Sequence, residues 1–404
     1  MTTKPTYTPA IRFPDFLNDG EWEDYSIEEV FDIRNGYTPS KSKTDYWENG
    51  TIPWFRMEDI RANGNILSDS IQHITPEAVK GFGLLPAYSI IVATSATIGE
   101  HALITVESLA NQRFTYLSKK KSFEERVDMM YFHYYMFVID EWCKKNTNTG
   151  GFLSVNMSAF RQLRIPLPPL AEQRRIAACL SALDEMLAAT NEKLEQMKAY
   201  KKGLMQKLFP AKGKKLPELR FKEFEKDGEW ETYKVSDLFK ITRGYVLPAS
   251  ETKATPDNIY KYPVYSSQTA NNGLMGYYFK ALYKNAITWT TDGANAGTVR
   301  FREGDFYCTN VCGVLIDDKG YSNLCVAEIL GMVSKKYVSL VGNPKLMNNV
   351  MGEIPICIPS LPEQRTISAL LSSMDISISA YEEKLKALGQ YKKGLMQQMF
   401  PTSK

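Results

Sequence analysis

Cysteine and histidine are scarce in this chain of 404 residues, which has six cysteines and three histidines. Six cysteines are too few for a disulfide scaffold in a chain this long, and they suit a reducing compartment. The closest group is Cys308, Cys312 and Cys325, and no histidine lies in that stretch. We expect Cys308 and Cys312 on one face of a strand, where free thiols behave as small apolar side chains. The sequence therefore predicts no metal site.

A long apolar segment is also lacking. The first 16 residues contain no apolar stretch of signal-peptide length. The longest apolar run, Met129 to Ile139, is interrupted by His133 and is too short to span a bilayer. We expect this run to form a buried helix, and a cytoplasmic location follows from both absences.

The chain also lacks a clear excess of basic residues, since 49 basic and 46 acidic residues give a net charge of +3. Composition alone therefore does not indicate nucleic acid. Residues 1–168 hold 17 basic and 21 acidic side chains, a net charge of −4, whereas residues 211–359 hold 19 and 16, a net charge of +3. An acidic module binds phosphate poorly. Either its cations are concentrated on one face, or another subunit supplies the contacts to the DNA backbone.

The feature that organises the chain is a repeat of its own segments. Residues 219–248 repeat residues 11–40 with a shift of 208, and residues 356–401 repeat residues 165–210 with a shift of 191. The repeated ends stay in step while the material between them changes, which indicates two whole modules. We predict a first module at 1–168, a helix at 169–210, a second module at 211–359 and a second helix at 360–404.

Both predicted helices carry a coiled-coil pattern. Apolar residues alternate at spacings of four and three between a Pro-rich start and a closing proline, once Thr190, Lys201 and Lys392 are included. About 38 residues correspond to a rod of about 57 Å. The residues predicted to pair the helices are Ile176, Leu180, Leu183, Leu187, Leu194, Met197, Leu204, Ile367, Leu371, Met374, Ile378, Tyr381, Leu385, Leu388 and Leu395.

A stripe this narrow cannot be buried alone, so we expect the two helices to pack on each other. A closed, pseudo-twofold arrangement, with the N-terminus beside the C-terminal helix, would make the pairing antiparallel. The alternative is that each helix docks separately on its own module. Lys201 and Lys392 interrupt the stripe and are interpreted as residues that fix its register.

The modules are predicted to be mixed α and β, with strands at Leu85–Ala93 and Ala286–Thr291. The overall fold class is therefore α+β. Polar loop residues are the candidates for binding DNA, because arginine, lysine, asparagine and glutamine can read base edges. Any one of them can equally be an ordinary turn residue. The candidates are Lys41, Lys43, Arg56, Arg61, Ser95, Thr97, Gln112, Arg113, Ser267, Gln268, Asn271, Asn272, Thr291, Asn295, Arg300 and Asn310.

Several short motifs of the sequence resemble those of the specificity subunit of Type I restriction-modification enzymes. They are GYTP at 36–39, IPWFRMEDI at 52–60, PLAEQR at 169–174 with its echo LPEQR at 361–365, and YKKGLMQ at 200–206 and 391–397. Together they cover nearly the whole chain.

The resemblance implies two target-recognition domains, each reading one half of a bipartite site in double-stranded DNA. It also implies two modification subunits that carry S-adenosylmethionine and methylate adenine, and restriction subunits that use ATP and Mg. No catalytic residue or cofactor is expected in this chain itself. It has no Asn/Asp-Pro-Pro-Tyr/Phe motif and no phosphate-binding loop of the Gly-x-x-x-x-Gly-Lys-Ser/Thr type.

Two other functions stay open at this point. The chain could be the specificity partner of a related restriction system that also recognises a bipartite site. It could also be a coiled-coil assembly scaffold that does not bind DNA.

Overall fold

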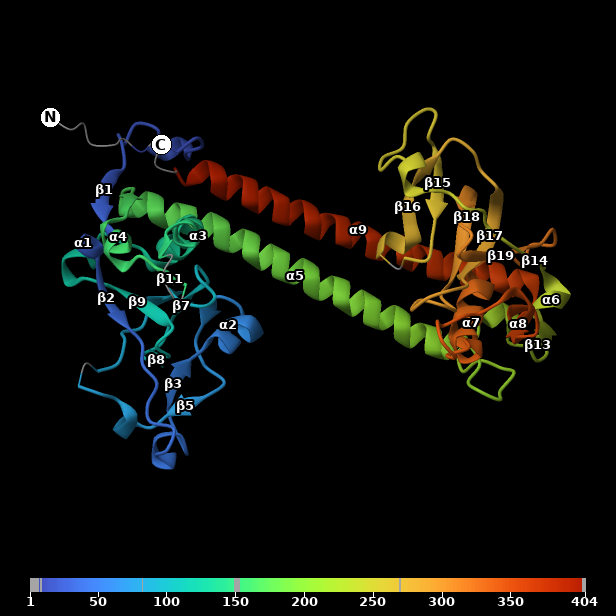
Figure 1. Cartoon of the computed structure of the whole chain (residues 1–404), viewed down its shortest axis with the longest axis horizontal. Helices are drawn as coiled ribbons and strands as arrows, with labels where there is room; N and C mark the ends of the chain where they lie inside the picture. The colour runs from blue at the N-terminus through green and yellow to red at the C-terminus, as the bar shows by residue number, and fades with distance from the viewer. Residues whose placement is uncertain (1–6, 8, 82, 149–152, 269, 402–404) are drawn as a thin grey trace. The chain divides into compact units, whose positions relative to one another are not determined.

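The computed structural model describes residues 7, 9–81, 83–148, 153–268 and 270–401, and it divides the chain into two compact units (Figure 1). Unit 1 consists of Met1–Ala189 with Leu385–Lys404, and unit 2 consists of Thr190–Lys384. Each unit therefore combines one module with a part of both long helices.

Unit 1 is built on a five-stranded sheet in the order β2-β9-β6-β7-β4 and a three-stranded sheet in the order β5-β3-β8. The predicted strand at Leu85–Ala93 is confirmed as β6, which begins only at Ser89. The helices and strands of this module are β1 (Glu23–Ser26), α1 (Ile27–Val30), β2 (Phe31–Asn35), β3 (Ile52–Phe55), α2 (Met57–Asn63), β4 (Ile66–Leu67), β5 (His73–Ile74), β6 (Ser89–Ala93), β7 (His101–Ile104), β8 (Leu109–Ala110), β9 (Phe114–Lys119), α3 (Met129–Lys145), β10 (Thr147–Asn148), β11 (Ser154–Val155), α4 (Met157–Gln162) and β12 (Arg164–Leu167).

Both faces of the larger sheet in unit 1 are covered, which explains why β6 is buried along its whole length. Ile90 and Val92 of β6 pack in the same core as the buried helix α3, which confirms the helix predicted from the apolar run at Met129. Ile91, on the other face, packs in a second core with Phe55 and Tyr116.

Unit 2 is built on a six-stranded sheet in the order β14-β19-β17-β18-β15-β16. The predicted strand at Ala286–Thr291 is confirmed as β17, which is longer at its start. The helices and strands of this module are β13 (Glu231–Lys234), α6 (Val235–Leu238), β14 (Lys240–Arg243), β15 (Tyr262–Tyr265), β16 (Leu274–Tyr278), β17 (Tyr283–Thr290), β18 (Val299–Cys308), β19 (Cys312–Ile316), α7 (Leu324–Ser334), α8 (Asn348–Gly352) and β20 (Pro355–Ile358).

One sequence prediction about the cysteines is wrong. Cys308 ends β18 and Cys312 begins β19, so the two residues lie on different strands and not on one face of the same strand. A turn through Thr309 separates them, with the Cys312 amide donating to the Thr309 carbonyl. Both thiols are buried in one small core of unit 2, and burial raises the pKa of Cys312 to about 11.

Each module closes on itself through its first and last strands. β1 pairs antiparallel with β12, and β13 pairs antiparallel with β20 in the same way. The strand before the long helix thus returns beside the strand that opened the module.

The two predicted long helices are confirmed as α5 (Leu170–Leu208) and α9 (Leu361–Met399). None of the residues predicted to pair them is exposed. In unit 1, Ile176 and Leu180 of α5 share the module's core with Met399 and Phe400, at the end of α9 and just after it. In unit 2, Ile367 of α9 shares the core with Phe209, which follows α5. The core of each module therefore contains residues from the start of one long helix and from the end of the other. The helices pack on the modules as well as on each other.

The segment before the first strand of each module contacts the C-terminal end of a long helix. In unit 1 the Ile11 amide donates to the Gln398 carbonyl over 3.1 Å, and in unit 2 the Leu219 amide donates to the Lys207 carbonyl over 2.9 Å. The N-terminal segment does lie beside the C-terminal helix, as the repeat predicted.

The repeated Glu-Gln words at the helix starts hold these segments in place. Glu172 accepts two hydrogen bonds of 2.7 Å from Arg12, and Glu363 accepts bonds of 2.8 and 2.7 Å from Arg220. Both carboxylates are buried, and a bidentate guanidinium is the strongest partner for such a group.

The glutamine after each of these glutamates fastens the helix start to its own module. Gln173 donates to the carbonyl oxygens of Pro168 and Arg126, each over 2.8 Å. Gln364 donates to the Pro359 carbonyl over 2.8 Å and accepts from Asn323. The Glu-Gln motif, which is part of the family resemblance, thus connects the start of each long helix to its module.

Candidate nucleic-acid interface

One glycine in each repeat marks the sheet edge where the polar loops gather. A Cβ on Gly36 would lie 2.2 Å from the Asn111 carbonyl oxygen, and a Cβ on Gly244 would lie 2.1 Å from the Cys308 carbonyl oxygen. Real Cβ atoms do not approach backbone oxygens so closely, so only glycine lets the chain that leaves β2 or β14 pass over the neighbouring loop.

In the first module, the loops that follow β2, β3 and β6 meet the loop that precedes β9. Thr38 donates to the Gln112 side chain, and the Asn111 amide donates to the Phe55 carbonyl over 3.0 Å, just before Arg56. The Thr94 amide donates to the Arg113 carbonyl over 3.2 Å. The candidates that the structure brings to this edge are Arg56, Ser95, Thr97, Gln112 and Arg113.

Arg56 is the most constrained of these candidates. Its backbone amide donates to Asp59 over 2.6 Å at the start of α2, and its guanidinium lies 5.8 Å from the ring centroid of Trp54. Its Nε is buried and has no hydrogen-bond partner in the part of the chain that the structure describes. Arg61 lies further along α2 and is exposed.

Lys41 and Lys43 lie outside the edge cluster, in the exposed loop before β3. Lys43 contacts Tyr46, with 3.2 Å between its Nζ and the tyrosine hydroxyl. No hydrogen bond among the described residues joins either lysine side chain to the loops at the sheet edge.

In the second module, the loops after β15 and β17 are joined to each other and to the turn between β18 and β19. Asn295 donates to the Ser267 carbonyl over 3.1 Å, and the Thr309 hydroxyl lies 3.1 Å from that of Ser266. The Thr291 amide donates to the Val311 carbonyl over 2.9 Å. These bonds place most of the second set of candidates around one edge.

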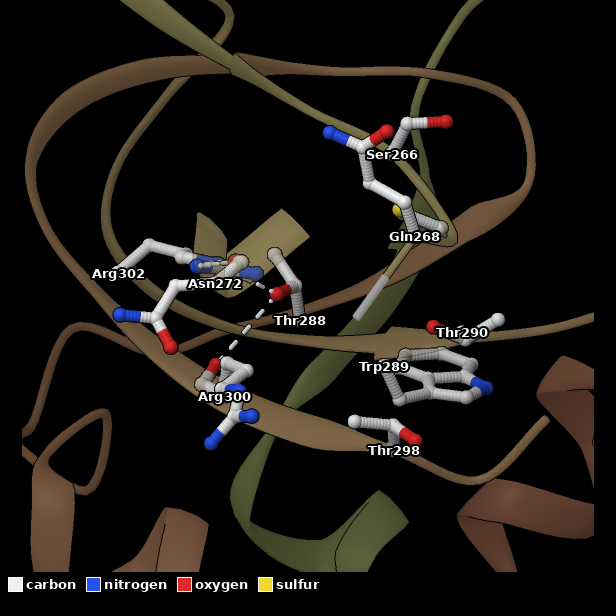
Figure 2. Close-up of a pocket in the computed structure, with 10 residues that line it drawn as sticks. Ser266, Gln268, Asn272, Thr288, Trp289, Thr290, Thr298, Arg300 and Arg302 are labelled. Carbon is white, nitrogen blue, oxygen red and sulfur yellow. Dashed lines mark hydrogen bonds between the residues drawn. The ribbon is translucent and has the colours of Figure 1, made fainter. Parts of the chain in front are cut away.

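A small pocket lies between these loops and the surface of the sheet (Figure 2). Its lining comes from β17, β18, the residue just before β18, the first residue of β19 and the loop after β15. The lining residues are Ser266, Gln268, Asn272, Thr288, Trp289, Thr290, Thr298, Arg300, Arg302 and Cys312. Three of the predicted candidates, Gln268, Asn272 and Arg300, therefore lie in it together.

Arg302 is the charged centre of this pocket and is only 8% exposed. Its Nε donates to the Thr288 hydroxyl over 3.1 Å and its Nη1 donates to the Asn272 carbonyl over 2.8 Å, as Figure 2 shows. The guanidinium carbon lies 3.7 Å from the ring centroid of Tyr265. Burial lowers the pKa of Arg302, because no carboxylate among the described residues forms an ion pair with it.

The remaining candidates of the second module have different surroundings. Asn271 and Asn310 are exposed, and Asn271 joins Asn272 in a turn where both residues have positive φ. Thr291 is fully buried, and its hydroxyl donates to Asp292 over 2.6 Å. Thr291 therefore holds its loop from inside, while the asparagines present side chains at the surface.

Sequence reasoning missed Arg302 and Thr288 because both lie within strands, while only loop residues were considered. A signal for Arg302 did exist: Arg300 and Arg302 are two apart in a strand, so both belong to the same face of the sheet. Thr288 lies opposite Arg300 in the register of β17 and β18.

Within the part of the chain that the structure describes, no group of three or more His, Cys, Asp or Glu residues is arranged to hold a metal ion. Over the same residues, no helix is both long enough and apolar enough to cross a membrane.

The comparisons with known proteins match specificity subunits of Type I restriction-modification systems. A family model for the Type I restriction modification DNA specificity domain matches residues 19–199 and again residues 227–389. The chain is 36% identical over 377 residues to the Type I restriction enzyme EcoprrI specificity subunit of Escherichia coli, and the match covers 91% of each chain. It is 38% identical over 146 residues to the N-terminus of a putative type I specificity subunit of Mycoplasma pneumoniae, covering 35% of this chain and 76% of that one.

The fold is also similar to a solved structure. The S subunit of a Type I restriction-modification system from M. genitalium matches with a TM-score of 0.65 over 98% of this chain and 100% of that one, at 18% sequence identity. At this identity, the likeness concerns the fold alone.

Proposed function

The chain belongs to the family of Type I restriction-modification DNA specificity subunits, and from that premise we propose how its two modules and two helices are used. Its role is the recognition of DNA, which is a non-catalytic role in such systems. The family model matches the chain twice, once for each module, which is consistent with a bipartite recognition site.

Each module reads one half of a bipartite site in double-stranded DNA through the loops at its glycine-marked edge. The observation that supports this most directly is that the loops that differ most between the repeats are joined at the same edge in both modules. A common scaffold with different loops is what two different half-sites require, because base edges are read by individual side chains. The modules are taken as 1–168 and 211–359, with spacer helices at 169–210 and 360–404.

The paired helices dock two modification subunits, and restriction subunits join them in the full complex. The modification subunits supply S-adenosylmethionine to methylate adenine. The restriction subunits use ATP and Mg to cut DNA. The charge of the first module supports a role for these partners in holding DNA. Its net charge of −4 leaves it little capacity to bind phosphates by itself. The complex works in the cytoplasm.

The test is to produce this chain together with its modification subunits in a strain that lacks adenine methylation, and to map methylated adenines by single-molecule sequencing. We expect one motif made of two defined halves separated by unspecified bases. The modification subunits alone, as the control, should give no such motif.

The outcome also separates the alternative roles. A scaffold that does not bind DNA would leave the same motif in place when loop residues of both modules are exchanged. A methylation pattern without two halves would contradict the proposal.

A further inference from the structure

The pocket around Arg302 holds a buried positive charge that no carboxylate among the described residues balances. The Arg302 guanidinium donates to the Thr288 hydroxyl and to the Asn272 carbonyl, and it takes part in no ion pair among the described residues. Burying a charge without a partner costs several kcal/mol in general, so a fold keeps one only where something else repays it.

The surrounding atoms hold the guanidinium still without neutralising it. Thr288 and Asn272 accept two of its five possible hydrogen bonds, and Tyr265 packs against its face. The other donors have no hydrogen-bond partner among the described residues. Arg302 therefore has a fixed orientation before a ligand binds, and its remaining N–H donors are available to that ligand.

The loop that closes over Arg302 is shaped for this contact. Asn271, Asn272 and Gly273 all have positive φ, and a Cβ on Gly273 would lie 3.2 Å from Nη2 of Arg302 and 3.1 Å from the Ser266 carbonyl oxygen. Two consecutive non-glycine residues in this conformation store strain, which persists where the surroundings impose it. The carbonyl of Asn272 faces the guanidinium as a result.

The size and chemistry of the pocket select the ligand. A group the size of one water molecule has about 10 Å³ in which to move inside the pocket, so one phosphate oxygen fits there. Hydroxyl groups of Ser266, Thr288, Thr290 and Thr298 line it beside the arginine. Arginine with serine and threonine hydroxyls is the usual set of donors to phosphate oxygens in protein–DNA contacts.

We propose that this pocket binds one backbone phosphate of DNA in the half-site read by the second module, with Arg302 as the residue that neutralises it. The inference rests on the proposed function and adds a specific contact to it. Bound phosphate would balance the buried charge and fix the loop that carries Gln268, Asn271 and Asn272 against the bases. Arg302 then positions the DNA, and the exposed loop side chains read it.

The experiment measures DNA affinity of the complete complex as a function of salt, on a duplex that carries the mapped motif. Neutralising one phosphate contributes about 0.9 to the slope of log affinity against log salt concentration. Arg302→Gln should therefore reduce this slope by about 0.9, so that raising salt from 50 to 200 mM costs about 3.5-fold less affinity than in the parent. The matched control is Lys284→Gln, which removes an exposed cation of the same β17–β18 hairpin and should leave the slope unchanged.

A second measurement locates the phosphate. A neutral methylphosphonate placed at successive positions should weaken binding of the parent at one position in the second half-site, and should have no further effect there on Arg302→Gln. If Arg302→Gln does not assemble, Arg302→Lys replaces it. That variant keeps the charge, so the slope should stay and the same position should remain sensitive.

Two results would overturn the proposal. One is a loss of affinity that is the same at every salt concentration, which indicates a purely structural arginine. The other is a scan in which no position is coupled to residue 302. If no bipartite motif exists, the proposed function fails instead, and the salt slope on a random duplex still tests Arg302 by itself.

Discussion

At the residue scale, the molecule relies on a few buried charged groups whose partners come from distant parts of the chain. Glu172 and Glu363 are fixed by arginines 160 and 143 residues away. His133 and Asp140 are buried in unit 1 with one unpartnered polar atom each, while Asp140 also contacts His101 over 2.6 Å. Such groups make stability depend on single side chains, because a buried charge or dipole is expensive without its partner.

The ion pair of Glu363 with Arg220 is predicted to be essential for the stability of unit 2. Glu363→Ala would leave the largely buried Arg220 guanidinium without a counter-charge, and we expect a loss of about 3–5 kcal/mol in the free energy of unfolding. Denaturant unfolding of the full chain measures it. The control is Glu353→Ala, which breaks the exposed pair with Lys234 and should leave the midpoint unchanged. Equal effects of the two variants would contradict the prediction.

His133 is predicted to weaken the protein in mild acid. Burial, together with the charges of His101 and Lys392, lowers the pKa of His133 from 6.5 to about 3. Between these values the unfolded chain binds a proton that the folded chain does not, so stability is full above about pH 6.5 and falls as the pH is lowered. At pH 5 the loss from this group is about 2 kcal/mol.

His133→Phe should remove that share of the pH dependence, measured as the difference in unfolding free energy between pH 7.5 and pH 5. Burial raises the pKa of Asp140, which acts in the opposite direction, but Asp140 is present in both proteins and cancels in the comparison. Phe137→Leu, at a neighbour of His133 on α3 that does not titrate, should keep the parent's pH dependence. A His133→Phe variant with the parent's pH profile would show that this histidine is not the sensitive group.

At the scale of elements, α5 and α9 exchange reciprocal ion pairs within each unit. Lys201 of α5 contacts Asp375 of α9 over 2.6 Å in unit 2, and Lys392 of α9 contacts Asp184 of α5 in unit 1. The lysines interrupt the apolar stripe at matching positions of the repeat, and both are less than one-fifth exposed. An antiparallel pair that slips along its axis would separate each lysine from its aspartate, so these pairs favour one register.

A double-mutant cycle on Lys201→Met and Asp375→Ala should therefore give a coupling of about 0.5–3 kcal/mol in the unfolding free energy of the chain. The exposed pair of Lys198 and Glu382, also between α5 and α9, is the matched control. We expect that pair to show no measurable coupling, since exposed ion pairs contribute little. Additive effects at Lys201 and Asp375 would mean that the buried lysine does not specify register.

At the scale of the whole molecule, each module is a closed structural unit on a shared plan. The first and last strands of each module pair with each other, and Glu23 lies opposite Leu167 while Glu231 lies opposite Ile358. An exchange that begins in the first strand and ends in the last one replaces the two paired strands together. The natural boundaries for a swap are therefore visible in the register of β1 with β12.

Exchange of residues 23–166 for the equivalent segment of another family member should change one half of the methylated motif and leave the other half intact. The reason is that the loops at the two edges are held by contacts within their own module. Mapping of methylated adenines gives the answer directly, and exchange of residues 231–358 should alter only the other half. A swap that changed both halves would show that the modules do not read DNA independently.

Much of the architecture was determined by the sequence itself. The 4-3 spacing of apolar residues between Pro169 and Pro210 is a local pattern, and it predicted α5 almost to the residue. The repeat predicted that the N-terminal segment lies beside the C-terminal helix, because equal sequences take equal surroundings. The loop polarity of Gln268, Asn272 and Arg300 marked three residues that the structure brings into one pocket.

The tertiary structure decided what those patterns could not encode. Arg302 looks like an ordinary strand residue, and only the closure of the loop at Asn272 buries it without a counter-charge. Cys308 and Cys312 are close in sequence, yet a turn puts them on different strands. Local spacing predicts a helix because its hydrogen bonds join near neighbours, and it predicts a strand because successive side chains alternate between the two faces of a sheet. A site depends on which distant loops reach the same edge, and that follows from packing across the whole unit.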